Sequence, residues 1–476
     1  MPSGPTNIYI GILKAEHDFG FATLSSITGY QASHALVTFQ GGSPILGSLA
    51  FPTAFNMFYE KNKTFSQELQ LTSRKSDSRF DWVVGAFYYD DHTELRLDTI
   101  GTCIGGVCAG ATPTRSDGFP STRSGSIYGD GTYRFFTSTK VTIGLRYTNE
   151  DKALTGTLTP LPGYANSVVA LPPTNALFPG ATFIANVNGV PTLQPGIPTK
   201  LNFDRLTYRG VLQQDIGDDI HLYVQHNLGF KSGAYNGNLF SNPPVNPELL
   251  YATEGGIKTE LLDRRLRLNG SYFHYTYKNV QVRSIAPPAP PGNAFLQNIA
   301  SERVDGIDAD FSAVPLRGLT INGTLEHLIA RYVDYPGATR VTQGPNRVIN
   351  GITVGSVVNT TPFNLAGFTP QNAPEFSASI GFVYSYDTRL GAFSFSANDH
   401  YTSSTSRTND DSVIDPPHHI VDLSLGRTSA SKRYDASLWV KNLGDEYTFA
   451  AGQISTNFVV VPGAPRTFGG TVGVHF

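Results

Sequence analysis

This sequence has few charged residues and no long apolar run. Asp, Glu, Lys and Arg together make up 15% of its 476 residues, against about 25% in soluble proteins. No stretch approaches the roughly 18 consecutive apolar residues that a membrane-spanning helix needs. If the chain crosses a bilayer, it must do so as a closed β-barrel, because only helices and barrels satisfy every backbone polar group there.

Signatures of catalysis, of nucleic-acid binding and of export are also missing. A net charge of −3 gives no hint of a nucleic-acid partner. There is no G-x-S-x-G, no Walker loop and no H-E-x-x-H, so we expect no enzyme, no cofactor and no resident metal. The N-terminal MPSGPTNIYIGILKAEH has no basic segment, apolar core or small-residue cleavage site, and it is therefore not predicted to be a signal peptide.

The chain contains two cysteines, Cys103 and Cys108, in the segment CIGGVC. They can be small loop residues without a role, or they can form a local disulfide in an oxidising compartment. A metal site is the least favoured interpretation, because two thiols without a nearby histidine supply too few ligands.

What the chain does have is glycine, aromatic residues and alternation. It contains 48 glycines and 12% aromatic residues, nearly all Phe and Tyr. In residues 140–150, KVTIGLRYTNE, the side chains of Val141, Ile143, Leu145 and Tyr147 alternate with polar ones. A period of two predicts a β-strand with one apolar face and one polar face.

About 17 segments with this pattern can be delimited by turn signals. They lie near residues 5–17, 19–32, 64–75, 80–98, 122–136, 139–158, 202–216, 220–236, 247–262, 265–284, 295–313, 318–335, 374–386, 391–405, 418–430, 434–448 and 465–476. Many are longer than the five or six residues usual for soluble strands, as expected for tilted strands that cross a bilayer and extend beyond it.

The connections between these segments alternate between short and long. Short turns such as SDSR, IGDD and LDRR are followed by long connections near residues 33–63, 99–121, 159–201 and 336–373, and by moderate ones near 237–246, 406–417 and 449–464. Short turns on one side and long loops on the other are typical of an outer-membrane barrel. We therefore predict an all-β fold, a transmembrane antiparallel β-barrel.

Several segments resemble TonB-dependent outer-membrane receptors. They are FSQELQLTSRKSDSRFDWVVGAFYYDDH (65–92), residues 250–282, residues 298–332, and the end of the chain from HHIVDLSLGRTSASKRYDASLWVKNLGDEYTFAAGQ to PGAPRTFGGTVGVHF. The resemblance implies the barrel of a receptor in the outer membrane of a Gram-negative bacterium. It also implies three partners: membrane lipid, the TonB complex and the barrel-assembly machinery.

The resemblance also implies a 22-stranded barrel filled by an N-terminal plug. Residues 1–476 show strand alternation from about residue 5 and no plug-like region. An odd count near 17 would place the first strand's start on the external side, whereas bacterial barrels have an even number of strands. We therefore expect residues 1–476 to be a partial barrel, a fragment without a plug domain or signal peptide.

Two sets of residues are candidates for function. Asp410, Asp411, Asp415, His418 and His419 fall in one predicted external loop, where they could bind a cation or metal chelate or simply face water. In the last segment, Phe468, Val472, Val474 and Phe476 share one face. The resemblance implies that this C-terminal strand is what the insertion machinery recognises.

The predicted function is capture of a scarce solute by the external loops for TonB-energised uptake, without catalysis. The solute could be a ferric siderophore-like chelate, a cobalamin-like cofactor or an oligosaccharide. One alternative is a passive porin-like channel. Another is a soluble β-rich protein used in adhesion or carbohydrate binding.

Overall fold

We analysed a computed structural model of the chain. It describes residues 6–41, 54–74, 79–100, 103–104, 107–108, 114–160, 177–178, 183–187, 190–194, 198–236, 244–284, 295–349, 352–454 and 458–475. Every regular element among them is a β-strand, which confirms the predicted all-β class. Within these described ranges, no helix is long and apolar enough to cross a bilayer.

Eighteen strands form one sheet. Its first part consists of β1 (Thr6–Asp18), β2 (Ala22–Gly41), β3 (Ala54–Ser73), β4 (Phe80–Ile100), β7 (Thr114–Arg134), β8 (Thr139–Pro160), the two-residue β9 (Leu177–Phe178) and β12 (Lys200–Ile216). The rest are β13 (Ile220–Lys231), β14 (Glu248–Leu261), β15 (Leu266–Ser284), β16 (Phe295–Leu316), β17 (Leu319–Asp334), β20 (Phe376–Thr388), β21 (Gly391–Thr402), β24 (His418–Ser429), β25 (Tyr434–Lys441) and β28 (Thr467–Val474). Apart from β9, each strand overlaps one predicted segment, but β2, β3 and β7 extend well into the long connections predicted near residues 33–63 and 99–121.

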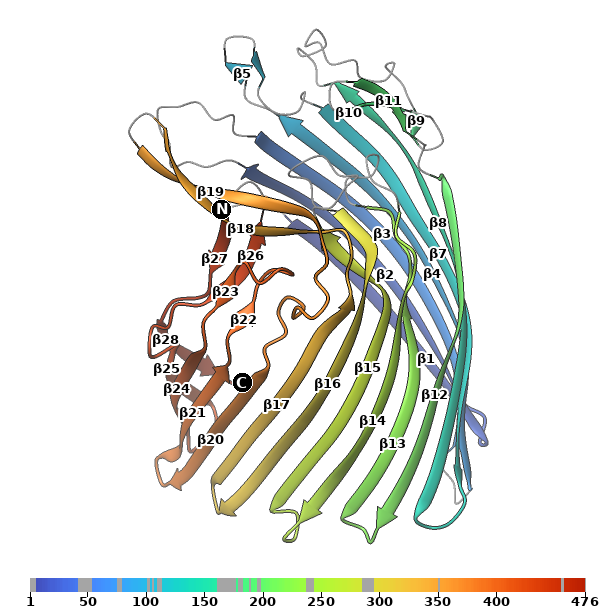
Figure 1. Cartoon of the computed structure of the whole chain (residues 1–476). Coiled ribbons are helices and arrows are strands. Elements are labelled where there is room, and N and C mark those ends of the chain that lie inside the picture. Colours follow the sequence, from blue (N-terminus) through green and yellow to red (C-terminus); the bar gives the residue numbers. More distant parts are fainter. Residues whose placement is uncertain are drawn as a thin grey trace. The chain divides into compact units, whose positions relative to one another are not determined.

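The chain divides into two compact units. Unit 1 comprises Met1–Thr132, Ile143–Tyr208 and Phe230–Pro247; unit 2 comprises Tyr133–Thr142, Arg209–Gly229 and Glu248–Phe476. In unit 1, each strand from β1 to β4 pairs antiparallel with the next, and Figure 1 shows β2, β3, β4, β7 and β8 side by side. In unit 2, the same neighbour-to-neighbour pairing runs from β14 to β17, continues through β20, β21, β24 and β25, and ends at β28.

Alternation gives β8 and β14 to β17 two unlike faces, as predicted, whereas β1 is exposed throughout. In β8, the side chains of Ile143 and Leu145 are 62% and 52% exposed, whereas Thr148, on the opposite face, is buried. In unit 2, Ile257, Leu268, Ile307 and Leu325 are exposed and lie on one face of β14 to β17. We call this the apolar face of unit 2 and its opposite the polar face. An exposed apolar face on strands of this length suits contact with lipid.

Short turns join strands where the chain must reverse tightly. Gly391 has φ +119°, and a Cβ there would lie 2.0 Å from the Thr428 carbonyl oxygen, so only glycine fits without displacing the neighbouring strand. The turn between β14 and β15 has Leu262, Asp263 and Arg264 in the left-handed region. The short connections predicted at these positions are therefore real turns.

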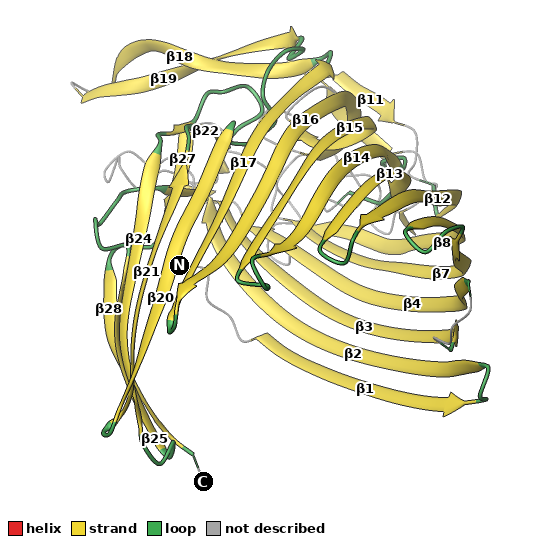
Figure 2. Ribbon diagram, turned by 90° about the horizontal axis from the view of Figure 1, so that it is seen from below, coloured by secondary structure: helices red, strands yellow, loops and turns green. Residues whose placement is uncertain are grey.

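The predicted long connections contain strands of their own, which the sequence pattern did not indicate. Residues 336–373 include the hairpin β18 (Ala338–Ile349) and β19 (Ile352–Phe363), and residues 449–464 include β26 (Phe449–Ile454) and β27 (Phe458–Pro462). Figure 2 shows β18 and β19 as a ribbon apart from β20, β21 and β24. In a hairpin, the backbone N–H and C=O groups of the two strands hydrogen-bond to each other without the main sheet. Three shorter pairs do the same: β5 (Cys103–Ile104) with β6 (Val107–Cys108), β10 (Phe183–Val187) with β11 (Val190–Gln194), and β22 (Thr405–Ser406) with β23 (Ile414–Asp415).

Candidate functional site

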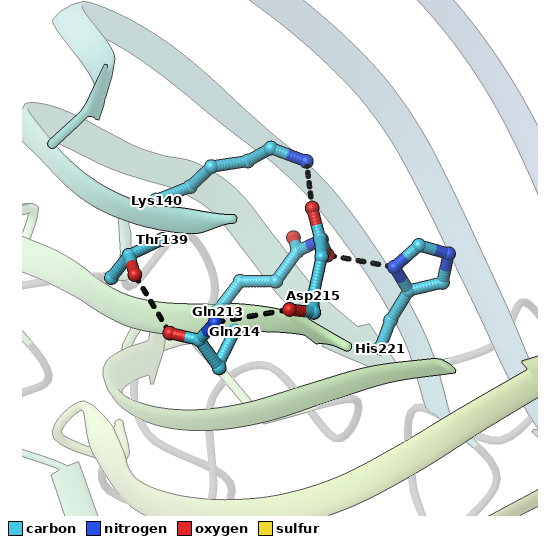
Figure 3. A network of polar contacts seen from close by, with 6 residues as sticks. All are labelled: Thr139, Lys140, Gln213, Gln214, Asp215 and His221. Atoms are coloured by element: carbon cyan, nitrogen blue, oxygen red, sulfur yellow. Dashed lines mark hydrogen bonds and ion pairs between the residues drawn. The ribbon is translucent and has the colours of Figure 1, made fainter. Parts of the chain in front are cut away.

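Close to a short turn of unit 2, the polar face carries a hydrogen-bonded carboxylate. Asp215, at the end of β12, lies 2.8 Å from Lys140 Nζ and 2.7 Å from His221 Nδ1 (Figure 3). Gln213 Nε2 donates at 2.8 Å to Asp215 Oδ1, the oxygen that also faces His221. The backbone N–H of Asp215 donates to the Ser138 carbonyl oxygen at 2.7 Å. This network joins three strand ends and stabilises the turn region.

A second carboxylate on the polar face is that of Glu254 in β14. Its Oε1 accepts a hydrogen bond from the Tyr223 hydroxyl, and its Oε2 accepts a hydrogen bond from Gln225 Nε2 at 3.1 Å. The ammonium group of Lys258 lies 5.5 Å from the centroid of the Tyr223 ring, a favourable cation–π distance. The polar face therefore offers a dense set of donors and acceptors held by their neighbours.

In unit 1, one arginine is held between two aromatic rings. The guanidinium of Arg146 lies 5.7 Å from the ring centroid of Phe87 and 5.5 Å from that of Tyr128. The Tyr128 hydroxyl donates to Glu68 at 2.6 Å. Arg146 is one of the polar residues that alternate with Leu145 and Tyr147 in β8, and it lies on the face opposite to theirs.

Tyr235 lies in the connection that follows β13, and its hydroxyl is harder to ionise than that of an exposed tyrosine. Burial raises the pKa of its hydroxyl to about 12. The hydroxyl donates to the Pro198 carbonyl at 2.9 Å. It therefore stays protonated at physiological pH and ties two connections of unit 1 together.

The most developed site in unit 2 is a cluster of connections beyond β17, which we call the loop cluster. It comprises residues 332–341, 363–375 and 403–415. Its apolar centre is formed by Tyr332, Tyr335 and Leu365, which are buried and pack with Val282, Ala300 and Ala338. The Tyr332 and Tyr335 rings meet edge to face at 4.9 Å. Long connections are usually solvated, so a buried aromatic centre indicates that these connections have a fixed shape.

A buried ion pair links the parts of the loop cluster. The Asp415 side chain is fully buried, and its Oδ2 lies 2.6 Å from Arg407 Nη2. Its Oδ1 accepts the backbone N–H of Phe449 at 3.2 Å, and Arg407 Nη1 donates to Asn372 Oδ1 at 2.9 Å. A buried carboxylate is tolerated only with such partners, so Asp415 holds three connections in register.

Asp410 plays a similar part. Its Oδ2 accepts the backbone N–H of Val341 in β18 at 2.7 Å, and its Oδ1 accepts the Ser412 hydroxyl at 2.5 Å. Nearby, the Tyr332 hydroxyl donates to Asn409 at 2.9 Å. The β18–β19 hairpin is thus fastened to the connection that follows β21.

The five residues predicted for ligand binding fall into two groups. Asp410 and Asp415 are buried and face other residues of the loop cluster, whereas Asp411 and His419 are exposed and His418 is half-buried. His419 Nδ1 lies 3.0 Å from Asp399 Oδ2, and His418 Nδ1 lies 2.9 Å from the Pro416 carbonyl oxygen. The structure therefore does not bring the five side chains to one point, and ligand binding by them stays a prediction.

The other predicted positions lie elsewhere. The backbones of Cys103 and Cys108 pair with each other, but their side chains are outside the described part of the chain, and the disulfide stays a prediction. Among the described residues, no group of three or more His, Cys, Asp and Glu is placed to hold a metal ion.

The C-terminal strand has one strongly exposed apolar face. Phe468 and Val472 are 82% and 80% exposed, and Val474 is also exposed. They stand opposite Val440, Ala436 and Tyr434 of β25. Phe476 lies outside the described residues. Phe468, Val472 and Val474 thus lie at alternate positions of one exposed strand face, and recognition of this strand by insertion machinery stays a prediction.

Arg407, Asn372 and Tyr332 are not among the residues predicted from the sequence. Arg407 is close to Asp415 along the chain, but Asn372 and Tyr332 reach the loop cluster from connections far away in the sequence. The one local signal is the density of Thr, Asn, Asp and Ser in residues 405–412, which is typical of side chains that bond to nearby backbone.

Comparison with known proteins supports this architecture. The family model "TonB dependent receptor-like, beta-barrel" matches residues 6–443. The ferric yersiniabactin uptake receptor FyuA from Yersinia pestis is similar with a TM-score of 0.74 and 16% identity, over 99% of this chain and 61% of that one.

Two further solved structures are similar at the level of the fold. The siderophore receptor PiuA from Acinetobacter baumannii gives a TM-score of 0.68 at 15% identity, over 98% of this chain and 64% of that one. The ferric citrate transporter FecA gives 0.67 at 13% identity, over 98% and 61%. The chain thus spans less than two thirds of the length of these receptors.

Proposed function

Because the chain belongs to the TonB-dependent receptor-like β-barrel family, we propose that it forms the barrel of an outer-membrane receptor of a Gram-negative bacterium. Its external loops capture a scarce solute, and force transmitted by the TonB complex drives uptake. No covalent step is involved. The exposed apolar residues on alternate positions of the strands support the membrane location.

The observation that carries the proposal is the loop cluster. Rigid loops on a β scaffold are a common way to present a binding surface, and a preformed surface avoids the entropy cost of ordering loops when the solute binds. Here the Asp415–Arg407 pair and the Asp410–Val341 bond fix connections that come from three parts of the chain. Passive pores have no comparable need for a preformed capture surface.

We propose a ferric chelate as the solute class, ahead of a cobalamin-like cofactor or an oligosaccharide. The similar structures are described as receptors or transporters for ferric yersiniabactin, a siderophore and ferric citrate. The exposed Asp411 and His419 and the half-buried His418 are the candidate contacts, since Asp410 and Asp415 already have partners within the loop cluster.

Uptake of radioactive iron tests this function. Cells that express the protein are supplied with ⁵⁵Fe-citrate and, separately, with an ⁵⁵Fe-catecholate, with and without an intact TonB complex. We expect accumulation that depends on TonB. Replacing both Asp411 and His419 (D411N/H419Q) should reduce chelate binding by at least about tenfold, since the loss of even one charge-assisted hydrogen bond has about that effect.

The control variant is Asp387→Asn, an exposed carboxylate close to the short turn after β20, which should leave uptake unchanged. Uptake that continues equally without TonB would instead identify a passive channel. Recovery of the protein in the soluble fraction, without detergent, would contradict both transport readings.

The barrel-assembly machinery is the proposed partner of β28. Phe468, Val472 and Val474 form an exposed apolar row on this strand, and such a row can be recognised before the strand meets lipid. Membrane lipid is the proposed partner of the same row after insertion.

A further inference from the structure

The apolar face of unit 2 gives way to polar residues on β15 and β16, whereas β17 keeps the exposed Ile329 and Val333 on that face. Strand pairing places Thr253, His274, Asp305 and Ile329 in one row across β14, β15, β16 and β17. On the side of this row that leads to the short turns, the same face carries the exposed residues Ile257, Leu268, Ile307 and Leu325. On β15 and β16 this row therefore marks the edge of the apolar face.

The acidic group in this row already has donors. His274 Nδ1 lies 2.7 Å from Asp305 Oδ1, and the Tyr272 hydroxyl donates to the same oxygen at 2.9 Å. Tyr272 is exposed on the apolar face, where a tyrosine with its ring in lipid and its hydroxyl toward water is typical of a membrane interface. These two bonds hold the Asp305 carboxylate at this edge, where it contributes a single negative charge.

The next row, two residues further from the short turns, is basic. Arg303 stands directly opposite Arg331 across the β16–β17 pair, and it stands opposite Thr276 of β15. Two residues beyond Thr276, Lys278 is exposed, with its ammonium group 5.1 Å from the Tyr251 ring centroid. The three cations therefore lie on the same face as Ile307 and Leu325, beyond its apolar part. We call Lys278, Arg303 and Arg331 the basic row.

Two arginines directly opposite each other on one sheet face repel. Arg303 is exposed, and both hydrogen bonds described for Arg331 come from its Nη1, to the Ala330 carbonyl and to Thr369 Oγ1. An anion with several oxygens would relieve the repulsion, because guanidinium groups match phosphate geometry. The arrangement is therefore complementary to a phosphate group.

We propose that the basic row binds the phosphate groups of a lipid headgroup, whose acyl chains lie along the apolar face of unit 2. The juxtaposition points to a lipid and not to free phosphate, because Arg303 and Arg331 lie two residues, about 7 Å of strand, beyond the Tyr272–Asp305 edge of an exposed apolar surface. Lys278 lies two residues further along β15. Both parts of an amphipathic phospholipid or phosphoglycolipid thus find a matching surface. This goes beyond the proposed function, since lipid binding needs neither TonB nor a solute.

The test is native mass spectrometry of the full chain in detergent, with hexa-acylated, bisphosphorylated lipid A as the probe. We expect lipid A to remain bound to the unaltered chain, and the dephosphorylated form to bind far more weakly. The R303Q/R331Q double variant should bind about 30-fold more weakly, since each basic residue near a membrane surface contributes about a fivefold factor.

The matched control is Arg267→Gln, which removes the same charge from β15 but on the polar face, beside Asp310. It should leave lipid A binding unchanged. If the double variant fails to fold, as judged by heat-modifiable gel migration, then Lys278→Gln and Arg303→Lys are compared; K278Q should bind more weakly and R303K should keep most of the binding.

Three results would overturn the proposal. One is equal loss of lipid A in R267Q and R303Q/R331Q, which would indicate non-specific charge attraction. Another is unchanged binding in R303Q/R331Q. The third is complete displacement of lipid A by millimolar inorganic phosphate, which would identify a free-anion site. None of these outcomes depends on whether the protein transports a chelate, so failure here is distinguishable from failure of the proposed function.

Discussion

At the scale of single residues, the buried polar groups of the loop cluster are the most informative. Asp415 is fully buried, and its two oxygens bond to Arg407 and to the Phe449 backbone. A carboxylate in this position stabilises the structure only while its partners remain, because an unpaired buried charge is costly. The loop cluster therefore depends on this one side chain more than on any exposed residue in the same connection.

Replacing Asp415 by alanine should increase local opening of the loop cluster and leave the sheet folded. Leaving Arg407 without its buried partner costs about 3 kcal/mol, which corresponds to about a 100-fold higher population of the open connection. Trypsin cleavage after Arg407 measures this directly, because proteolysis follows local opening.

The control for this substitution is Asp411→Asn. Asp411 is exposed, in the same connection, at φ +55°, a conformation that asparagine tolerates. Its cleavage rate should match that of the unaltered chain. Equal rates for D415A and D411N would show that the ion pair does not hold the loop cluster.

At the scale of elements, the strands were predictable and the contacts between connections were not. Residues 140–150 alternate so regularly that the strand and its faces follow from the sequence, and β8 confirms both. By contrast, the β18–β19 hairpin was predicted as loop, because its Val and Thr residues are interrupted by Gly344 and Pro345, where the pairing register shifts. The Arg407–Asn372 bond joins residues with no shared periodicity, so no local pattern indicates it.

The two faces of one strand should respond oppositely to the same charge. Leu325 is exposed on the apolar face of β17, and Thr324 lies on the polar face, where it shares a hydrogen bond with Ser379. We expect Leu325→Lys to lower the free energy of unfolding in lipid vesicles by about 2–4 kcal/mol, the cost of a lysine at mid-membrane depth. Thr324→Lys should cost far less.

Urea titration of both variants, refolded into phosphatidylcholine vesicles and followed by tryptophan fluorescence, measures this difference. Equal destabilisation by L325K and T324K would mean that the apolar face of β17 does not contact lipid. A larger effect of T324K would reverse the assignment of the two faces.

At the scale of the whole molecule, the family match and the strand pattern support one account. The chain has the fold of TonB-dependent receptor barrels and spans 61–64% of the length of FyuA and PiuA. The sheet has an exposed apolar face and a polar face rich in paired charges, and the loop cluster gathers connections around a buried centre. Solute identity is the part that neither strand alternation nor fold can reveal, since fold and function are separable.

The most direct test of this account is a spin-label accessibility scan along β8 in lipid vesicles. Nitroxides are placed singly at residues 140–147 of a chain in which Cys103 and Cys108 are replaced by serine. We predict that collisions with oxygen, which concentrates in lipid, peak at Val141, Ile143, Leu145 and Tyr147, and that collisions with a water-soluble nickel chelate peak at the residues between them. If the two reagents instead peak at the same positions, or if neither profile has a period of two, the strand does not separate lipid from water and the account is contradicted.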